Sequence, residues 1–239
     1  MSYNVKSFDL FHTNTENDSL QNGFDFIAET NPDVLLVQEY YESSKIQLNF
    51  PYQYIKKRRE GGKFGMAVYS KFKIINSGSL DLKNTSNNII FADIIKEKDT
   101  IRIYNLHLES LKIKPYEENF GEENSEKLLK RVRSSFKKQA DQTKFFLEHQ
   151  QNWTGKQIVG GDFNNTAYSW VYNQISGTKK DAFVEAGKGF GKTFQYFLPT
   201  RIDFILTDEK AIINTFKTFS VKYSDHYPIL SRINWEVAL

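Results

Sequence analysis

Short apolar segments recur along the chain, and polar residues bound each of them. They cover residues 33–40, 65–70, 89–96, 100–108, 157–161, 202–207 and 228–234. These segments are too short for most helices, and they carry apolar residues on both faces. A strand that is buried on both faces needs a packing layer on each side. We therefore expect a sheet that packs against a second sheet on one face and against helices on the other.

Two longer segments predict helices. Residues 19–32, SLQNGFDFIAETNP, have apolar side chains at helical spacing and end at a proline, which stops a helix. Segment 123–151 is predicted to bury one stripe of side chains at steps of three and four, namely Leu128, Val132, Phe136, Ala140, Thr143 and Leu147. Basic residues on its other faces are interleaved with acids, which favours a solvated face over a nucleic-acid patch.

The chain is long enough to bury one large core. Its 239 residues fit a single layered domain over residues 1–239. Hydrophobic residues make up 39% and aromatic residues 15% of the sequence, which indicates a packed globular protein rather than a disordered one. Cysteine is absent, so the sequence excludes a disulfide framework, thiol catalysis and a thiolate metal site.

The charge and the apolar runs limit the partners. A formal net charge of +3 lacks the basic excess that would by itself indicate nucleic-acid binding, so local groups must hold an anionic substrate. No run of about 18 apolar residues could span a membrane, and we expect the chain to be soluble as given. The strand-like SYNVKSFDLF begins at residue 2, which favours a domain trimmed at its N-terminus from a longer or membrane-anchored protein. The sequence does not determine the cellular localisation.

Polar clusters follow the apolar segments. In QIVGGDFNNT (157–166), two glycines, an acid and two amides end an apolar strand, which for a single strand is typical of a turn. Similar clusters lie at other strand ends, and together they provide carboxylates, amides, a hydroxyl and imidazoles: Glu39, Asn105, His107, Asp162, Asn164, Asp203, Ser224, Asp225 and His226. Chance turns do not repeatedly combine these groups, so the clusters indicate a chemical site.

Six short segments, in chain order, carry a family resemblance: SYNVKSF, LLVQE, NLHL, GGDFNN, RIDFIL and SDHYPI. Through these motifs the chain resembles, over nearly its whole length, the endonuclease/exonuclease/phosphatase family typified by pancreatic deoxyribonuclease. The resemblance implies an α/β fold of the α+β type, a four-layer α/β/β/α sandwich of two packed, mostly antiparallel sheets flanked by helices. It also implies hydrolysis of a phosphate ester with a divalent metal ion, in a cleft at one edge of the sheets.

The resemblance and the chemistry of phosphate esters together assign the metal ligands. Cleavage of the ester needs a cation that offsets charge on the phosphoryl oxygens. Glu39 resembles the family's main ligand of a hard ion, Mg²⁺ or Mn²⁺, which prefers oxygen ligands. Asn4 matches the family's first-strand asparagine beside that ion, and Asp225 is expected to join it directly or through water.

The resemblance also assigns the catalytic residues. Asp162 is similar to the carboxylate that orients or deprotonates the attacking water, and Asn164 is similar to an amide that donates to the phosphate. His226 is expected to contact a non-bridging phosphate oxygen, while Asp203 holds its imidazole. His107 resembles a second histidine that assists the leaving group.

Further residues are candidates for substrate contacts. Asn105 is assigned to substrate binding, and Arg58 either reaches a phosphate or decorates a hairpin. Gly160 and Gly161 are expected to allow close approach of the backbone. Loops 111–126 and 186–196 are expected to select the substrate. Within the second loop, three aromatic residues either line the leaving-group pocket or belong to the core: Phe190, Phe194 and Tyr196.

Two departures from the family pattern narrow the choice of substrate. Some repair-type members have an acid two residues after the first-strand asparagine, where this chain has Lys6, and an aromatic residue where it has His107, which argues against an abasic-site repair enzyme. A nucleic acid, a phospholipid and a small phosphorylated molecule stay open as substrates, with a slight preference against an extended nucleic-acid groove. The alternative from another class is a non-catalytic scaffold that keeps the fold. We expect a monomer without a stable protein partner.

Overall fold

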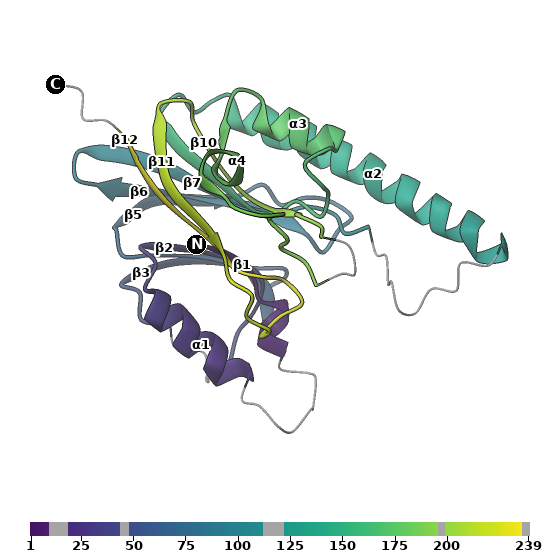
Figure 1. Ribbon diagram of the computed structural model, residues 1–239, viewed down its shortest axis with the longest axis horizontal. Helices are drawn as coiled ribbons and strands as arrows, with labels where there is room; N and C mark the ends of the chain where they lie inside the picture. Colours follow the sequence, from purple (N-terminus) through teal and green to yellow (C-terminus); the bar gives the residue numbers. More distant parts are fainter. Residues whose placement is uncertain (10–18, 44–47, 112–121, 196–198, 236–239) are drawn as a thin grey trace.

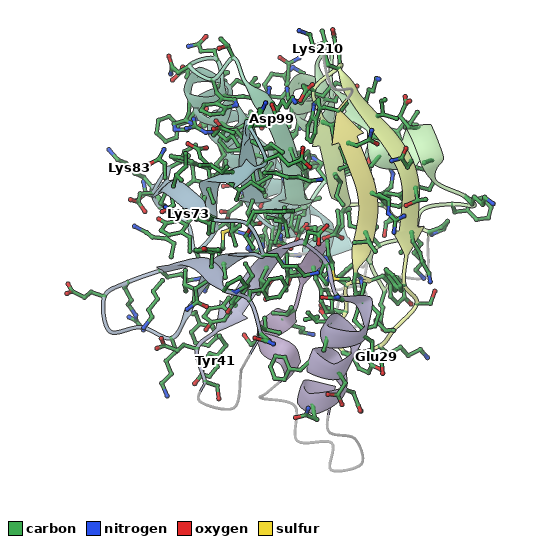
Figure 2. All side chains as sticks on the ribbon, turned by 90° about the vertical axis from the view of Figure 1, so that its left-hand side faces the viewer. Glu29, Tyr41, Lys73, Lys83, Asp99 and Lys210 are labelled. Atoms are coloured by element: carbon green, nitrogen blue, oxygen red, sulfur yellow. The ribbon has the colours of Figure 1, made fainter. Side chains whose placement is uncertain are left out.

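The protein is described by a computed structural model that places residues 1–9, 19–43, 48–111, 122–195 and 199–235. Within these residues, two six-stranded sheets pack face to face and carry helices on their outer faces (Figure 1). In a view turned by 90°, Glu29 lies on the helix below the first sheet and Asp99 lies in the second sheet above it (Figure 2). The four-layer sandwich implied by the family resemblance is confirmed.

The first sheet contains β1 (Ser2–Asn4), β2 (Val34–Tyr41), β3 (Tyr52–Lys57), β4 (Phe64–Ser70), β11 (Ala211–Thr218) and β12 (Ile229–Trp235), in the order β11-β12-β1-β2-β4-β3. The second contains β5 (Ile74–Ser79), β6 (Asn88–Lys96), β7 (Asp99–His107), β8 (Lys156–Asp162), β9 (Lys180–Asp181) and β10 (Asp203–Thr207), in the order β5-β6-β7-β8-β10-β9. The helices are η1 (Lys6–Asp9, a 3-10 helix), α1 (Ser19–Thr30), α2 (Glu122–Gln150), α3 (Trp170–Ser176) and α4 (Ala182–Ala186).

Separate apolar cores hold the layers together. Successive side chains of β2 point to opposite faces of the first sheet. Leu35 packs with Phe24 of α1 on the outer face, whereas Leu36 packs between the two sheets. On the outer face of the second sheet, Phe146 of α2 and Val171 of α3 belong to one buried cluster with the strands. The central strands are therefore buried on both faces, which is why their sequences read as continuous apolar runs.

Each sheet contains a single parallel pair among the described strands. These pairs are β1 with β2 and β7 with β8, and all other neighbours are antiparallel. Parallel neighbours require a crossover connection, which α1 supplies in the first sheet and α2 in the second. The crossovers bring the carboxyl ends of all four strands to one edge of the sandwich. The residues at or near those ends are Asn4, Glu39, His107 and Asp162.

The strands that the sequence did not predict are β3, β5, β9 and β11, and all four lie at the edges of the sheets. Edge strands face solvent on more of their surface, so their sequences lack the apolar run that reveals a central strand. The predicted strand SYNVKSFDLF is also shorter than expected. Of its described residues, 2–9, only Ser2–Asn4 pair as β1, and the chain then turns into η1.

The predicted apolar stripe of α2 is confirmed only in part, because Thr143 is fully buried and Leu147 packs against the core, whereas Phe136 does not. Phe136 is 44% exposed, and the face that packs on the sheet is largely polar, with Ser135, Gln139 and Gln142 buried beside Phe146. The helix also begins at Glu122, inside the predicted loop 111–126, while residues 112–121 of that loop lie outside the described residues. None of the described helices has the length and apolar character needed to cross a lipid bilayer.

Gly161 is required by the close pairing of β7 with β8. Its φ is +136°, and a Cβ atom there would lie 2.0 Å from the carbonyl oxygen of Leu106. A Cβ on Gly160 would lie 2.7 Å from the Leu36 side chain in the opposite sheet. The two glycines were expected to allow close approach of the backbone, and the approach that the structure shows is between protein segments.

We predict that Gly161→Ala lowers the free energy of unfolding by clearly more than Gly189→Ala. Gly189 also has a positive φ, +72°, but a Cβ there would meet nothing within 4 Å. Its substitution should cost only the roughly 1–2 kcal/mol of the left-handed backbone. Urea unfolding of both variants measures the difference, and equal losses would show that the clash at Leu106 is relieved without cost.

Candidate active site

Four predicted site residues meet at the edge where the parallel strands end. Asn4 Nδ2 donates hydrogen bonds to Glu39 Oε1 at 3.2 Å and to Asp162 Oδ2 at 3.0 Å. His107 Nε2 lies 3.8 Å from Glu39 Oε1 and 3.7 Å from Asp162 Oδ2. Each of the strands β1, β2, β7 and β8 therefore contributes one side chain to a single cluster.

Glu39 reaches this cluster because β2 contains a β-bulge. The pairing of β2 with β4 shifts between Val37 and Tyr40, and Glu39 has a φ of +51°, which non-glycine residues seldom adopt. Asn105 stabilises the interruption from the other sheet. Its Nδ2 donates to the carbonyl oxygens of Val37 at 3.0 Å and Ala67 at 2.9 Å.

Asn105 therefore differs from its predicted role as a substrate contact. It is fully buried, and its Oδ1 accepts a hydrogen bond from Gln38 Nε2 at 2.7 Å. Both amide hydrogens are used on backbone carbonyls, so none is left to donate to a ligand. The structure gives Asn105 a positioning role, because it holds the segment of β2 that carries Glu39.

Asp203 and His226 form a buried pair, as their predicted roles require. His226 Nδ1 lies 3.0 Å from Asp203 Oδ2 and 3.2 Å from Oδ1. The backbone N–H of Asp203 is held by Thr193 Oγ1 at 3.1 Å, and that of His226 by Ser224 Oγ at 3.2 Å. Burial by itself would lower the pKa of His226, but the negative charges of Asp203 and Asp162 outweigh it and raise the pKa to about 10. His226 is thus an imidazolium at neutral pH.

Asp162 lies between the two halves of the site and is almost completely buried. Its Oδ2 lies 3.8 Å from His226 Nε2, and its Oδ1 accepts the backbone N–H of Asn164 at 2.8 Å. Burial raises the pKa of Asp162 to about 7, although the charge of His226 and the hydrogen bonds oppose this shift. A carboxylate with a pKa in this range can take up a proton near neutral pH.

Asn164 was predicted to donate to the phosphate, but its amide is engaged within the protein. Its Nδ2 donates to Asp162 Oδ2 at 3.1 Å and to the carbonyl oxygen of Leu108 at 2.9 Å. Its φ of +50° is one that asparagine tolerates better than most residues. In this structure Asn164 therefore orients Asp162, and a bond to phosphate would replace one of these two contacts.

His107 is neutral at neutral pH, whereas His226 is positively charged. His107 is buried, and in the part of the chain that the structure describes no carboxylate lies within hydrogen-bond distance of its Nε2, so burial lowers its pKa to about 4. A neutral imidazole can donate one N–H hydrogen bond but holds no additional proton to transfer. His107 can therefore stabilise a leaving oxygen by hydrogen bonding.

Asp225 lies beside the cluster and forms an ion pair with Lys6, whose Nζ is 3.0 Å from Asp225 Oδ2. Ser224 links this pair to the cluster, because its Oγ donates to the carbonyl oxygen of Asn4 at 2.8 Å. The structure records no contact between Asp225 and Glu39 among the described residues. One oxygen of Asp225 is therefore engaged by Lys6, the residue at which the chain departs from the family pattern.

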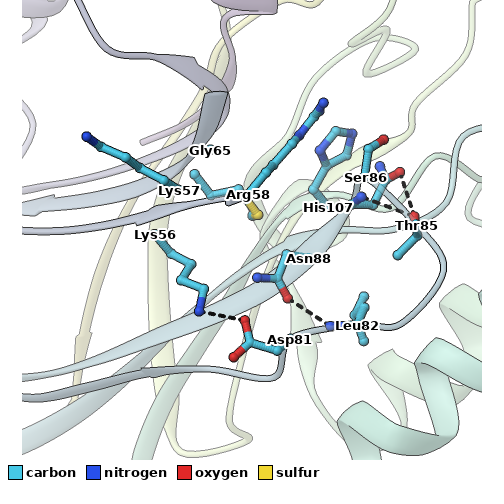
Figure 3. Close-up of a pocket in the computed structure, with 12 residues that line it drawn as sticks. Lys56, Lys57, Arg58, Gly65, Asp81, Leu82, Thr85, Ser86, Asn88 and His107 are labelled. Atoms are coloured by element: carbon cyan, nitrogen blue, oxygen red, sulfur yellow. Dashed lines mark hydrogen bonds and ion pairs between the residues drawn. The ribbon is translucent and has the colours of Figure 1, made fainter. Parts of the chain in front are cut away.

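Two other predictions concern the surroundings of the cluster. Arg58 lines a pocket together with His107, next to the site (Figure 3). Phe194 packs against His226, with ring centroids 4.9 Å apart, so this aromatic residue does line the site. Phe190 is 84% exposed and belongs to no core, and Tyr196 lies outside the described residues.

Comparison with known proteins identifies the family. The model of the Endonuclease/Exonuclease/phosphatase family matches residues 1–226. The chain belongs to the endonuclease/exonuclease/phosphatase family. No curated protein sequence matches it.

Solved structures of members of the endonuclease/exonuclease/phosphatase family share the fold. A family protein from Leptotrichia buccalis is 18% identical, with a TM-score of 0.68 and 98% of each chain covered. The mannosyl-6-phosphatase of Bacteroides thetaiotaomicron is 16% identical, with a TM-score of 0.60 and 98% of each chain covered. The human Nocturnin catalytic domain is 16% identical, with a TM-score of 0.66, and the match covers 98% of this chain and 93% of that one. At these identities the likeness shows the fold.

The divalent metal ion that this family implies fits the donors around Glu39. The Glu39 side chain is 35% exposed, and within the described residues its Oε2 has no hydrogen-bond partner. The neighbouring candidates, Asp225 and Asn4, also offer oxygen atoms, which suit a hard cation. A non-glycine residue held at a positive φ to expose a carboxylate is consistent with a ligand role.

A second group of possible donors is less suited to a metal. Donor atoms of Asp162, Asp203 and His226 lie within 4.8 Å of one another. Both oxygens of Asp203, however, lie within hydrogen-bond distance of His226 Nδ1, and an imidazolium cannot coordinate a cation. These donors therefore suit a metal ion less well than the oxygen atoms around Glu39 do.

The sequence did not single out the residues that support the cluster from behind. Gln139 of α2 is fully buried, and its Nε2 donates to the carbonyl oxygens of Glu109 at 2.7 Å and Asn164 at 3.1 Å. It fixes the segments that follow β7 and β8, including the one that orients Asp162. The signal that could have revealed it is a polar helix stripe, Ser135, Gln139 and Gln142, at steps of three and four.

We predict that Asp203→Asn lowers the pKa of His226, because the imidazolium loses its main counter-charge while it stays buried. In metal-free wild-type protein, NMR titration of the His226 ring should show the protonated form throughout neutral pH. In the variant, the ring should lose its proton at a much lower pH. His149 on α2 serves as the internal reference. A wild-type midpoint near 6.5, the ordinary pKa of a histidine side chain, would contradict the assignment.

Proposed function

We propose that the protein hydrolyses a phosphate ester and depends on a divalent metal ion, Mg²⁺ or Mn²⁺. The observation that carries this proposal is the placement of Asp162. A buried carboxylate, held by two amides, lies 3.8 Å from the Nε2 of an imidazolium and shares Asn4 with Glu39. Such an arrangement offers a base, a cationic donor and a metal ligand around one point, as phosphate-ester hydrolysis requires.

Asp162 is the group that activates water in this proposal. Its pKa of about 7 allows it to accept a proton from water as the water oxygen forms a bond to phosphorus. The hydrogen bonds from Asn4 and Asn164 fix the carboxylate plane. The bond between phosphorus and the leaving oxygen then breaks, and the alcohol leaves with a proton taken from solvent.

The two histidines stabilise different oxygens. His226, protonated because of Asp203, donates through Nε2 to a non-bridging phosphate oxygen on which negative charge increases. His107 donates a hydrogen bond to the leaving oxygen. Arg58, on the same side as His107, is available to contact the phosphate or the leaving group.

Glu39 holds the metal ion, with Asp225 and Asn4 as further oxygen donors. When bound, the ion supplies positive charge that offsets the charge of the phosphoryl oxygens. Because Asp225 is paired with Lys6, it would be a weaker ligand of the ion than Glu39. Both carboxylates lie at the exposed side of the cluster, each 35% exposed, where an ion can enter from solvent.

A non-catalytic scaffold is the less favoured reading. A scaffold would gain nothing from a buried carboxylate whose pKa is raised to about 7, which costs stability at neutral pH.

The names of the structural neighbours include a mannosyl-6-phosphatase, which supports a phosphatase reaction as one form of the proposed activity. The net charge of +3 gives no support to an extended nucleic-acid groove.

We predict that Asp162→Asn reduces turnover by about 100 to 10,000-fold, because the general base is lost. The measurement is hydrolysis of bis(p-nitrophenyl) phosphate and p-nitrophenyl phosphate with Mg²⁺ or Mn²⁺, alongside DNA, RNA and phospholipid. Asp141→Asn, at an exposed position of α2, is the matched control. Full wild-type turnover in excess EDTA, or inactivity of the wild type on every ester, would reject the proposed function.

We predict that Glu39→Gln raises the Mg²⁺ concentration needed for half-maximal activity by at least about tenfold. The amide keeps the shape of the side chain but removes the ligand charge. Glu42→Gln is the control, since Glu42 is an exposed carboxylate just beyond β2 that pairs with Lys57. An unchanged midpoint in Glu39→Gln would show that Glu39 is not a ligand.

A further inference from the structure

A small polar pocket opens beside His107. It has a volume of about 160 Å³ and lies between the β3–β4 hairpin and the segment that precedes β6 (Figure 3). We call it the His107 pocket and define it by Lys56, Arg58, Asp81, Ser86, Asn88 and His107. Because His107 Nε2 is 3.7 Å from Asp162, the inner end of the pocket borders the reacting centre on its leaving-group side.

The walls of the His107 pocket offer hydrogen-bond donors and acceptors together. Lys56 Nζ pairs with Asp81 Oδ1 at 2.7 Å, so their charges largely cancel, and the Asp81 side chain is 62% exposed. Arg58 is exposed and makes no ion pair within the part of the chain that the structure describes. Ser86 is also an exposed residue. These groups match a ligand that both donates and accepts hydrogen bonds.

The pocket lacks what other ligand classes need. The only aromatic ring among its twelve lining residues is the His107 imidazole, and no Phe, Tyr or Trp provides a large platform on which a nucleobase could stack. Only Met66 and Leu82 contribute apolar side chains, which leaves little surface for an acyl chain. Its volume of about 160 Å³ is also below the roughly 300–1,000 Å³ of pockets that enclose drug-sized ligands.

We infer that the His107 pocket binds the alcohol part of the substrate, and that this part is a compact, hydroxyl-rich group such as one sugar ring or a short polyol. The inference rests on the proposed function, because it names the leaving group of that reaction. The sugar hydroxyls donate to Asp81 and accept from Arg58 and Ser86. The phosphate then lies against Asp162 and His226, and His107 meets the oxygen that joins the two parts.

Binding of non-hydrolysable analogues tests this inference independently of turnover. The probes are the phosphonate analogues of glucose 6-phosphate and of thymidine 5′-phosphate, titrated by calorimetry into the wild-type protein with Mg²⁺. We expect the sugar phosphonate to bind about tenfold more tightly than the thymidine analogue. The thymidine analogue lacks a few of the polar contacts, and their loss corresponds to a factor of this order. Equal binding, or tighter binding of the nucleotide analogue, would overturn the inference.

Two variants locate the binding. Ser86→Phe places a large side chain in the pocket and should weaken binding of the sugar phosphonate by about tenfold. Ser77→Phe is the matched control, because Ser77 is an exposed serine on β5 outside the pocket. Asp81→Asn keeps a residue that tolerates the φ of +50° there and should also weaken binding. Identical affinities for the Ser86 and Ser77 variants would exclude this pocket.

The outcomes separate the two proposals. If the wild type cleaves p-nitrophenyl esters but shows no preference for the sugar phosphonate, the inference about the leaving group fails and the proposed function stands. If the wild type cleaves no ester at all while Ser86→Phe alone weakens the sugar phosphonate, the proposed hydrolysis fails and the pocket is a binding site.

Discussion

The amide of Asn105 joins the two sheets at the point where the active site begins. The bulge that turns Glu39 out of β2 leaves two buried carbonyl oxygens, of Val37 and Ala67, and Asn105 donates to both. Without those donors each carbonyl would cost about 1–3 kcal/mol. Because Asn105 and His107 lie two residues apart on β7, the same contact sets Glu39 and His107 relative to each other across the sheets.

The two buried histidines of the active site differ in charge. Both are nearly inaccessible to solvent, and burial lowers the pKa of each. Among the described residues, His226 has a carboxylate within hydrogen-bond distance, that of Asp203, and His107 has none; this is why the pKa of His226 rises to about 10 while that of His107 falls to about 4. A fixed cation and a neutral donor thus lie 3.8 Å and 3.7 Å from the same oxygen of Asp162, Oδ2.

The sequence predicted the buried strands correctly and missed the more exposed ones. Central strands, such as β7 and β8, carry apolar residues on both faces and were found. The four edge strands were missed, since their exposed side chains leave no apolar pattern. On α2 the sequence found Thr143 and Leu147 but missed Gln139, which is buried because carbonyl oxygens of distant loops accept its hydrogen bonds.

The sequence by itself determined the family, the layered fold and the residue types of the site, because apolar strands and the polar residues that end them are local patterns along the chain. Only the tertiary structure decided what each group is free to do. Asn105 and Asn164 are engaged inside the protein, and Lys6 holds Asp225. Whether a polar atom is free to bind a ligand, and what pKa a group has, depends on partners that the fold brings from distant parts of the chain. Asn4, for example, donates a hydrogen bond to Asp162, which is 158 residues away.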